Sequence, residues 1–313
     1  MKVEYLKYVK KKIYALIILI LIQTNVFGFE NEIIVKIDNE IITKIDIYNE
    51  VKYLSSLNPS LKNLDKNNLF QIAKSSLIRE KIKEIEISKM DDFTINQNYL
   101  ENIISNIYEN IGLKNEEEFI NYLKVQNISI EEIKEKISKE ALWNKLIFNK
   151  FNEKVKIDKK KIKNEIKNNK KFTNSYLLYE IIFNTEKKDD FQILFKKIKK
   201  SIEINGFENT ASIYSISDSA KVGGKLGWIN ESSISKKIMR EINNLNNGEY
   251  TNPIQIPGGF LILKVKEKKT LEQNTDEEAE FLLKVKALTN QQLNQYSNIY
   301  FNKIKKNIKI YEK

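Results

Sequence analysis

The sequence predicts an α+β protein: a mostly helical domain, formed by both ends of the chain, with a smaller domain of helices and strands inserted between them. Two observations predict this arrangement. Apolar residues recur at helical spacing through residues 43–170 and again after residue 276. Six of the nine glycines and two of the three prolines lie within residues 223–259, among short apolar runs typical of strands. Apolar residues make up 41% of the 313, which is enough for a substantial core.

The first 28 residues have the pattern of an export signal. Five lysines precede an apolar segment of ten residues, 13–22, and small side chains follow at Val26 and Gly28. The apolar segment is too short to span a bilayer comfortably. We therefore predict a signal peptide, residues 1–28, that is cleaved after Gly28 and leaves no stable membrane insertion. A retained signal, which would make the protein a membrane-tethered foldase, is the alternative.

Residues 29–171 are predicted to form the N-terminal helical domain. A short strand at residues 33–37 and a turn precede Thr43, which has capping-box spacing with Asp46 at the start of a helix. The residues expected on the buried face of this helix are Ile45, Tyr48, Val51 and Leu54. Further helices are expected at residues 68–90, 96–111, 115–125, 129–151 and 158–170. The last of these is rich in lysine and is expected to present a solvated face, with attraction to acidic membranes or clients as the alternative.

Residues 172–269 are predicted to form the compact α+β domain. The elements expected there are a strand at 176–183, helices at 190–205 and 207–215, the glycine-rich segment K-V-G-G-K-L-G-W-I at 221–229, a helix at 232–245, a turn at 246–249, and strands at 253–257 and 260–265. The switch from long helical patterns to short apolar runs marks this segment as a separate unit.

Residues 270–313 are predicted to return to the N-terminal domain. A helix begins at Asp276, and the chain closes with I-K-I-Y, an alternating strand. The buried stripe expected on this helix consists of Phe281, Leu282, Val285, Leu288, Tyr296, Ile299 and Ile304. A lone helix and a lone strand cannot bury themselves, so both are expected to dock on the N-terminal helices and on the unpaired strand at residues 33–37.

The composition excludes several classes of chemistry. The chain contains neither cysteine nor histidine, so disulfides, thiolate catalysis, serine–histidine–aspartate catalysis and nearly all zinc sites are excluded. No aspartate-rich loop with ligand spacing is visible, and we predict no metal, no cofactor and no ATP. The net charge of +11 accompanies heavy use of lysine, asparagine and isoleucine. This indicates compositional drift, and we predict no nucleic-acid partner.

The middle segment resembles a parvulin-like (PpiC-type) peptidyl-prolyl isomerase domain. G-G-K-L-G-W-I, a following helix, L-N-N-G-E-Y-T-N-P-I and G-G-F-L-I-L-K-V resemble its second half, and Y-E-I-I-F resembles its first strand. The strand and turn that lead into T-K-I-D-I-Y-N-E-V resemble the start of the SurA-type periplasmic chaperones. In that family a C-terminal helix completes an N-terminal helical domain around inserted parvulin domains, which implies the same arrangement here.

The resemblance implies a shallow apolar pocket that holds a proline-containing peptide. The family's pocket positions fall on Leu226, Ile234 and Ile238, all of them apolar. Trp228 and Phe260 are further candidates for peptide binding. Simple packing is the alternative role for Trp228.

The polar half of the family's site departs from the pattern. Its two histidines fall on Glu180 and Leu261, and the hydroxyl residue that links them falls on Ile256. The polar residue ahead of the glycines falls near Ser217 or Asp218, which makes Asp218 the candidate catalytic residue. A glutamate and two aliphatic side chains cannot reproduce a histidine hydrogen-bond network.

The resemblance therefore implies an ATP-independent periplasmic chaperone that binds unfolded outer-membrane proteins through apolar surfaces, with little or no isomerase activity. Many weak contacts suit such a chaperone, because its client must leave again. The alternative is an active parvulin-type peptidyl-prolyl cis-trans isomerase, which lowers the amide rotation barrier of about 18–20 kcal/mol.

Overall fold

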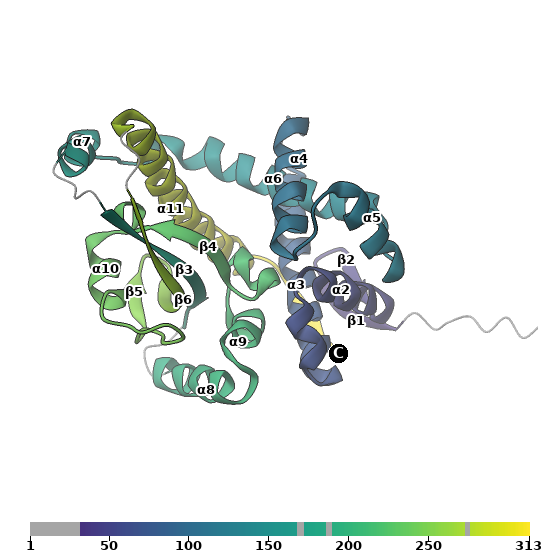
Figure 1. Ribbon diagram of the computed structural model, residues 1–313. Coiled ribbons are helices and arrows are strands. Elements are labelled where there is room, and N and C mark those ends of the chain that lie inside the picture. Colours follow the sequence, from purple (N-terminus) through teal and green to yellow (C-terminus); the bar gives the residue numbers. More distant parts are fainter. Residues whose placement is uncertain (1–31, 168–171, 186–189, 273–275) are drawn as a thin grey trace, which may run out of the picture.

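The computed structural model describes residues 32–167, 172–185, 190–272 and 276–313, and the predicted signal peptide lies outside them. Within these residues, two separate antiparallel sheets are accompanied by many helices, which confirms the predicted α+β class. Most N-terminal helices lie to one side in Figure 1, and the larger sheet lies to the other.

The elements follow one another in three groups. The N-terminal group consists of β1 (Ile33–Ile37), β2 (Glu40–Thr43), α2 (Lys44–Leu57), η1 (Pro59–Asn63), α3 (Lys66–Ile87), α4 (Gln97–Asn110), α5 (Glu116–Val125), α6 (Ile130–Phe151), η2 (Asn152–Lys154) and α7 (Lys159–Lys167). The middle group consists of β3 (Phe172–Phe183), α8 (Asp190–Asn205), α9 (Phe207–Tyr214), η3 (Asp218–Val222), β4 (Lys225–Asn230), η4 (Glu231–Ser233), α10 (Lys236–Ile242), β5 (Ile254–Ile256) and β6 (Gly259–Glu272). The C-terminal group consists of α11 (Glu277–Lys305) and β7 (Ile310–Glu312).

The capping box predicted at the start of α2 is confirmed. The Thr43 hydroxyl accepts a hydrogen bond from the main-chain N–H of Asp46 at 3.3 Å. The Asp46 carboxylate in turn accepts one from the main-chain N–H of Thr43 at 2.8 Å. Side-chain partners for these otherwise unpaired amides fix where the helix begins.

The buried face of α2 differs from the expected one. Ile45 and Tyr48 are exposed, whereas Ile47 is fully buried. The buried face also contains Glu50, whose carboxylate pairs with Lys136 of α6 at 2.7 Å. An apolar periodicity cannot detect a buried carboxylate, so the predicted stripe is displaced around the helix.

The C-terminal strand completes the small sheet, as predicted. Its strand order is β2-β1-β7, with Lys36 opposite Tyr311 in the antiparallel pair β1–β7. The turn after β1 is tied in as well, because the Asp38 N–H donates to the Lys309 carbonyl at 3.0 Å. Residues from both ends of the chain therefore form one sheet over the N-terminal core.

The long helix α11 packs against α7 near its start and α6 near its end (Figure 1). At the α6 contact, the Trp143 indole N–H donates to the Ser297 hydroxyl at 2.8 Å. The single buried stripe predicted for α11 is partly wrong, because Leu282 is 59% exposed and Ile299 is 41% exposed. A helix that contacts different neighbours along its length buries different faces, which one continuous stripe does not describe.

The larger sheet has the order β4-β3-β6-β5 and separates two cores. Successive residues of β3 and β6 alternate between a core beneath α10 and a core beneath α8 and α9. The helix expected at residues 232–245 is shorter, because η4 precedes α10. The boundaries predicted for the three domains, 29–171, 172–269 and 270–313, stay a prediction.

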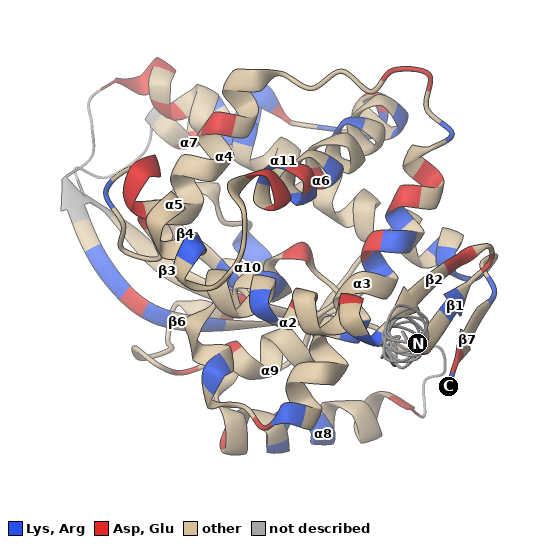
Figure 2. Cartoon of the chain, turned by 90° about the vertical axis from the view of Figure 1, so that its right-hand side faces the viewer, with Lys and Arg blue, Asp and Glu red and all other residues tan. Residues whose placement is uncertain are grey.

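On the face shown in Figure 2, basic and acidic residues are interspersed over the helices and along β6.

Candidate peptide-binding cleft

A cleft of about 470 Å³ lies on the α10 side of the larger sheet. The three predicted pocket residues, Leu226, Ile234 and Ile238, all line it. Its floor comes from alternate residues of β3 and β6, including Leu178 and Leu261. Alternation along a strand places every second side chain on the same face, which is why these residues meet. The volume lies within the range of about 300–1,000 Å³ that is usual for ligand sites.

Close packing of main chains at the edge of the cleft explains one of the clustered glycines. Gly224 accepts a hydrogen bond from the Glu180 N–H at 2.8 Å. A Cβ on Gly224 would lie 2.3 Å from the Glu180 carbonyl oxygen, and the φ of Gly224 is +79°. A residue with a side chain fits neither the space nor the left-handed conformation.

Glu180, which occupies the position of a family histidine, is the centre of a polar cluster in the cleft. The hydroxyl of Ser217 donates to Glu180 Oε1 at 2.6 Å, and that of Ser219 donates to the same oxygen at 2.9 Å. Burial raises the pKa of Glu180, and these two hydrogen bonds only partly oppose the effect. Ser217 is one of the two positions expected for the family's polar residue, whereas Ser219 was not expected; the run S-I-S-D-S at residues 215–219 was the available signal.

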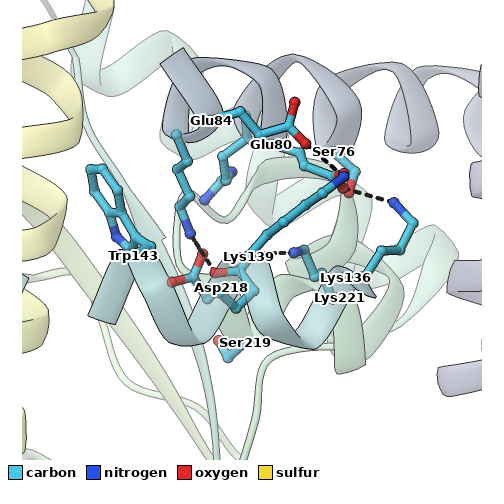
Figure 3. A network of polar contacts seen from close by, with 12 residues as sticks. Ser76, Glu80, Glu84, Lys136, Lys139, Trp143, Asp218, Ser219 and Lys221 are labelled. Carbon is cyan, nitrogen blue, oxygen red and sulfur yellow. Dashed lines mark hydrogen bonds and ion pairs between the residues drawn. The ribbon is translucent and has the colours of Figure 1, made fainter. Parts of the chain in front are cut away.

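Asp218, the candidate catalytic residue, also lines the cleft but is held from outside the sheet domain. Its carboxylate pairs with Lys83 of α3 at 2.6 Å (Figure 3). The Asp218 side chain is 45% exposed. One of its carboxylate oxygens accepts a hydrogen bond from the Lys83 ammonium and not from the Glu180 cluster. Its catalytic role stays a prediction.

A network of buried charges links the segment η3 to the N-terminal helices. Glu140 of α6 pairs with Lys83 at 2.7 Å and with Lys221 of η3. Burial alone would lower the pKa of Lys221, but the charge of Glu140 outweighs it and the pKa of Lys221 lies above its usual range. The network fixes one edge of the cleft to the helical part of the protein.

Two predicted peptide-binding residues lie elsewhere. Phe260 is on the opposite face of the sheet, with its ring centroid 4.4 Å from that of Phe191. It directly precedes Leu261, which is in the cleft, and neighbouring strand residues face opposite sides. Trp228 is 41% exposed and does not line the cleft; the Lys269 ammonium lies 4.0 Å from its ring centroid. Peptide binding by all five residues stays a prediction.

The fold and the cleft define a class of domain. Residues 179–267 match the rotamase family, the PPIC-type PPIase domain, and the predicted parvulin-like domain is thereby confirmed. The match covers the strand with Glu180, the glycine-rich segment, α10 and most of β6.

Over a longer stretch than this domain, the chain is similar to the SurA chaperones. It is 23% identical over 201 residues to chaperone SurA of Pseudomonas putida, a match that covers 61% of this chain and 47% of that protein. A match to chaperone SurA of Pseudomonas fluorescens is 24% identical over 163 residues and covers 49% of this chain and 38% of the relative. The chain therefore aligns with less than half the length of these chaperones.

The similar solved structures include a PpiC-type domain and a structure from work on SurA-like chaperones. One is a PpiC-type peptidyl-prolyl cis-trans isomerase domain, at 28% identity and a TM-score of 0.29, which covers 33% of this chain and 96% of that chain. The other comes from work on PEB4 and Cj1289, two SurA-like chaperones of Campylobacter jejuni, at 20% identity and a TM-score of 0.34, and covers 90% of this chain and 99% of that chain.

Proposed function

We propose that this protein is an ATP-independent periplasmic chaperone that binds unfolded outer-membrane proteins, and that its PpiC-type domain binds peptides with weak or no isomerase activity. The SurA relatives and the PpiC-type domain support the chaperone class. The predicted signal peptide supports the periplasmic location. In the part of the chain that the structure describes, no helix has the length and apolar character to cross a membrane.

The observation that carries the proposal is the apolar wall of the cleft. Leu226 of β4, Ile234 between η4 and α10, and Ile238 of α10 line one space. Leu226 is 37% exposed, so its side chain is accessible to a ligand in the cleft. An unfolded client can place apolar side chains against such a wall and gain the free energy of their burial.

The side chains at the family's polar positions support weak or absent isomerase activity. Ile256 and Leu261 line the cleft where the family has a hydroxyl residue and a histidine. Aliphatic side chains neither donate nor accept hydrogen bonds, so they cannot stabilise the twisted prolyl amide by hydrogen bonding.

Two assays on the mature full-length chain test the proposal. One measures how well the protein suppresses aggregation of an unfolded outer-membrane barrel protein diluted from urea, and the other measures cis-trans exchange in a proline peptide by NMR. We expect suppression without ATP and exchange close to the uncatalysed rate.

A matched pair of variants locates the client surface. Ile234→Asp puts a charge into the apolar wall and is expected to weaken suppression several-fold, because burying an unpaired charge is costly. Ile193→Asp makes the same change on α8, where Ile193 is 59% exposed, and is expected to leave suppression unchanged. Equal suppression by both variants contradicts binding in the cleft.

An active isomerase is the second candidate, and the Glu180 cluster is the observation that favours it. Glu180, Ser217 and Ser219 place a carboxyl group and two hydroxyls beside the apolar wall. If this cluster assists rotation about the prolyl bond, exchange will be fast in the unchanged protein and lost in Glu180→Ala. Robust exchange of that kind overturns the binding-only proposal.

A further inference from the structure

The cleft has a second wall, made by α11. Five carboxamide residues of this helix line the cleft opposite the apolar residues: Asn290, Gln291, Asn294, Gln295 and Asn298. They fall at spacings of three and four, so they share one face of the helix. The cleft therefore has one apolar wall and one wall of uncharged amides.

Among the described residues, these five side chains have no hydrogen-bond partner. A neighbouring amide on the same helix behaves differently. Gln292 donates to the Lys156 carbonyl at 2.9 Å and accepts from the Lys156 N–H at 3.0 Å. Each carboxamide carries two donors and an acceptor oxygen, so the amide wall offers many hydrogen bonds that other parts of the protein do not use.

The amide wall is not required to hold α11 in place. The helix is fixed by the hydrogen bond from Trp143 to Ser297 and by the ion pair of Lys284 with Glu165 at 2.8 Å. The Trp143 ring also stacks on Tyr300, with ring centroids 6.0 Å apart. None of these contacts uses the five amides, which therefore remain available to a ligand in the cleft.

We propose that the amide wall of α11 binds the main chain of an extended, uncharged client segment while the apolar wall receives its side chains. This inference rests on the proposed function. Peptide N–H and C=O groups lose hydrogen bonds to water when they enter an apolar cleft, and they need partners there. The side chains of asparagine and glutamine can donate to a peptide C=O and accept from a peptide N–H, whatever the client's sequence. Of the described residues that line the cleft, the ionisable ones are Glu180 and Asp218, both acidic and both bonded within the protein, so none of them is a cation that would select an acidic ligand.

The test uses the mature full-length chain and a capped, uncharged decapeptide that alternates leucine or tyrosine with alanine around a central proline. The variant combines Asn290→Ala with Asn294→Ala. Both residues are exposed on a helix, where alanine favours the fold. Loss of two hydrogen-bonding side chains is expected to raise the Kd measured by calorimetry about tenfold, which corresponds to about 1.4 kcal/mol. Gln292→Ala removes an amide that faces Lys156 and is expected to leave the Kd unchanged.

A second peptide separates main-chain recognition from a general loss of contact. N-methylation of alternate peptide groups removes their N–H donors and is expected to weaken binding to the unchanged protein, but to have much less effect on the double variant. An unchanged Kd in the double variant, or equal sensitivity of both proteins to N-methylation, overturns the inference while the proposed function stands. Absence of peptide binding to the unchanged protein, together with absence of aggregation suppression, overturns both.

Discussion

Glu140 is one of the residues that join the cleft edge to the N-terminal helices, and its removal gives a quantitative prediction. Its carboxylate compensates two lysines, Lys83 and Lys221, whose side chains are only 6% and 17% exposed. Glu140→Gln keeps the size and the hydrogen-bonding capacity of the side chain but removes the charge. Lys221 then has no other carboxylate within ion-pair distance among the described residues, whereas Lys83 keeps Asp218.

The expected loss is large because the charges are buried. Removing one partner of a buried ion pair costs about 3–5 kcal/mol, and the 25% exposure of Glu140 places the expected loss at the lower end, about 3 kcal/mol. With an unfolding entropy of about 2.1 cal/mol/K per residue, that loss corresponds to a fall in the melting temperature of about 5 °C for a chain of this size. The control is Glu135→Gln on the same helix. Glu135 is 68% exposed and pairs with Lys139 at 3.0 Å, so its removal is expected to cost less than about 1 kcal/mol.

The pH dependence gives an independent check. Burial would raise the pKa of Glu140, but the charges of Lys221 and Lys83 outweigh it and hold the pKa well below its usual range. The stability that Glu140 contributes is therefore complete above its unfolded pKa of about 4.3 and is lost as the pH falls toward the folded value. Urea unfolding followed by circular dichroism should show a gap between the unchanged protein and Glu140→Gln at pH 7 that narrows below about pH 4. If Glu140→Gln costs no more than Glu135→Gln at pH 7, the reasoning is refuted.

Two further predictions concern the cleft itself. Gly224→Ala and Gly227→Ala both place a side chain at a positive φ, which costs about 1–2 kcal/mol, but only the first brings a Cβ to within 2.3 Å of the Glu180 carbonyl oxygen. Thermal unfolding should therefore show an additional loss of about 1–3 kcal/mol for Gly224→Ala, and equal losses would contradict the close approach. Because burial raises the pKa of Glu180, folding disfavours its ionised form, and this penalty grows as the pH rises from about 4.3 through the folded pKa. Glu180→Gln should therefore be more stable than the unchanged protein at pH 8 and not at pH 3, as measured by urea midpoints; a variant less stable at pH 8 would count against a buried carboxyl of raised pKa.

Local signals in the sequence predicted much of the fold. The capping box at Thr43 and Asp46 depends on two residues three apart, and the structure has it as predicted. The pairing of β7 with β1 followed from a simple requirement, that an isolated strand needs a partner. The three apolar pocket residues came from the family resemblance, and the structure brings them to one cleft.

The parts that the sequence did not predict depend on contacts between distant residues. The buried face of α2 is set partly by Glu50, whose partners inside the protein are Lys136 of α6 at 2.7 Å and the Ser76 hydroxyl of α3 at 2.6 Å. Ser219 donates a hydrogen bond to Glu180 because of the path that the main chain takes just ahead of Gly223 and Gly224. The amides of α11 lie between the apolar residues of the predicted stripe, where a polar side chain gives no sign of what it faces, and the packing of the helix across the sheet domain brings them to the cleft.

The pairing of β7 with β1 also has a consequence for the order in which the protein folds. Every strand of the larger sheet has emerged once residue 272 has, so that sheet can form before α11 exists. By contrast, the side of β1 that faces away from β2 stays unpaired until residues 310–312 are present. An open strand edge is prone to pair with other chains. Until β7 is present, the N-terminal part of the chain therefore keeps an exposed strand edge, and in that interval it is open to pairing with another chain.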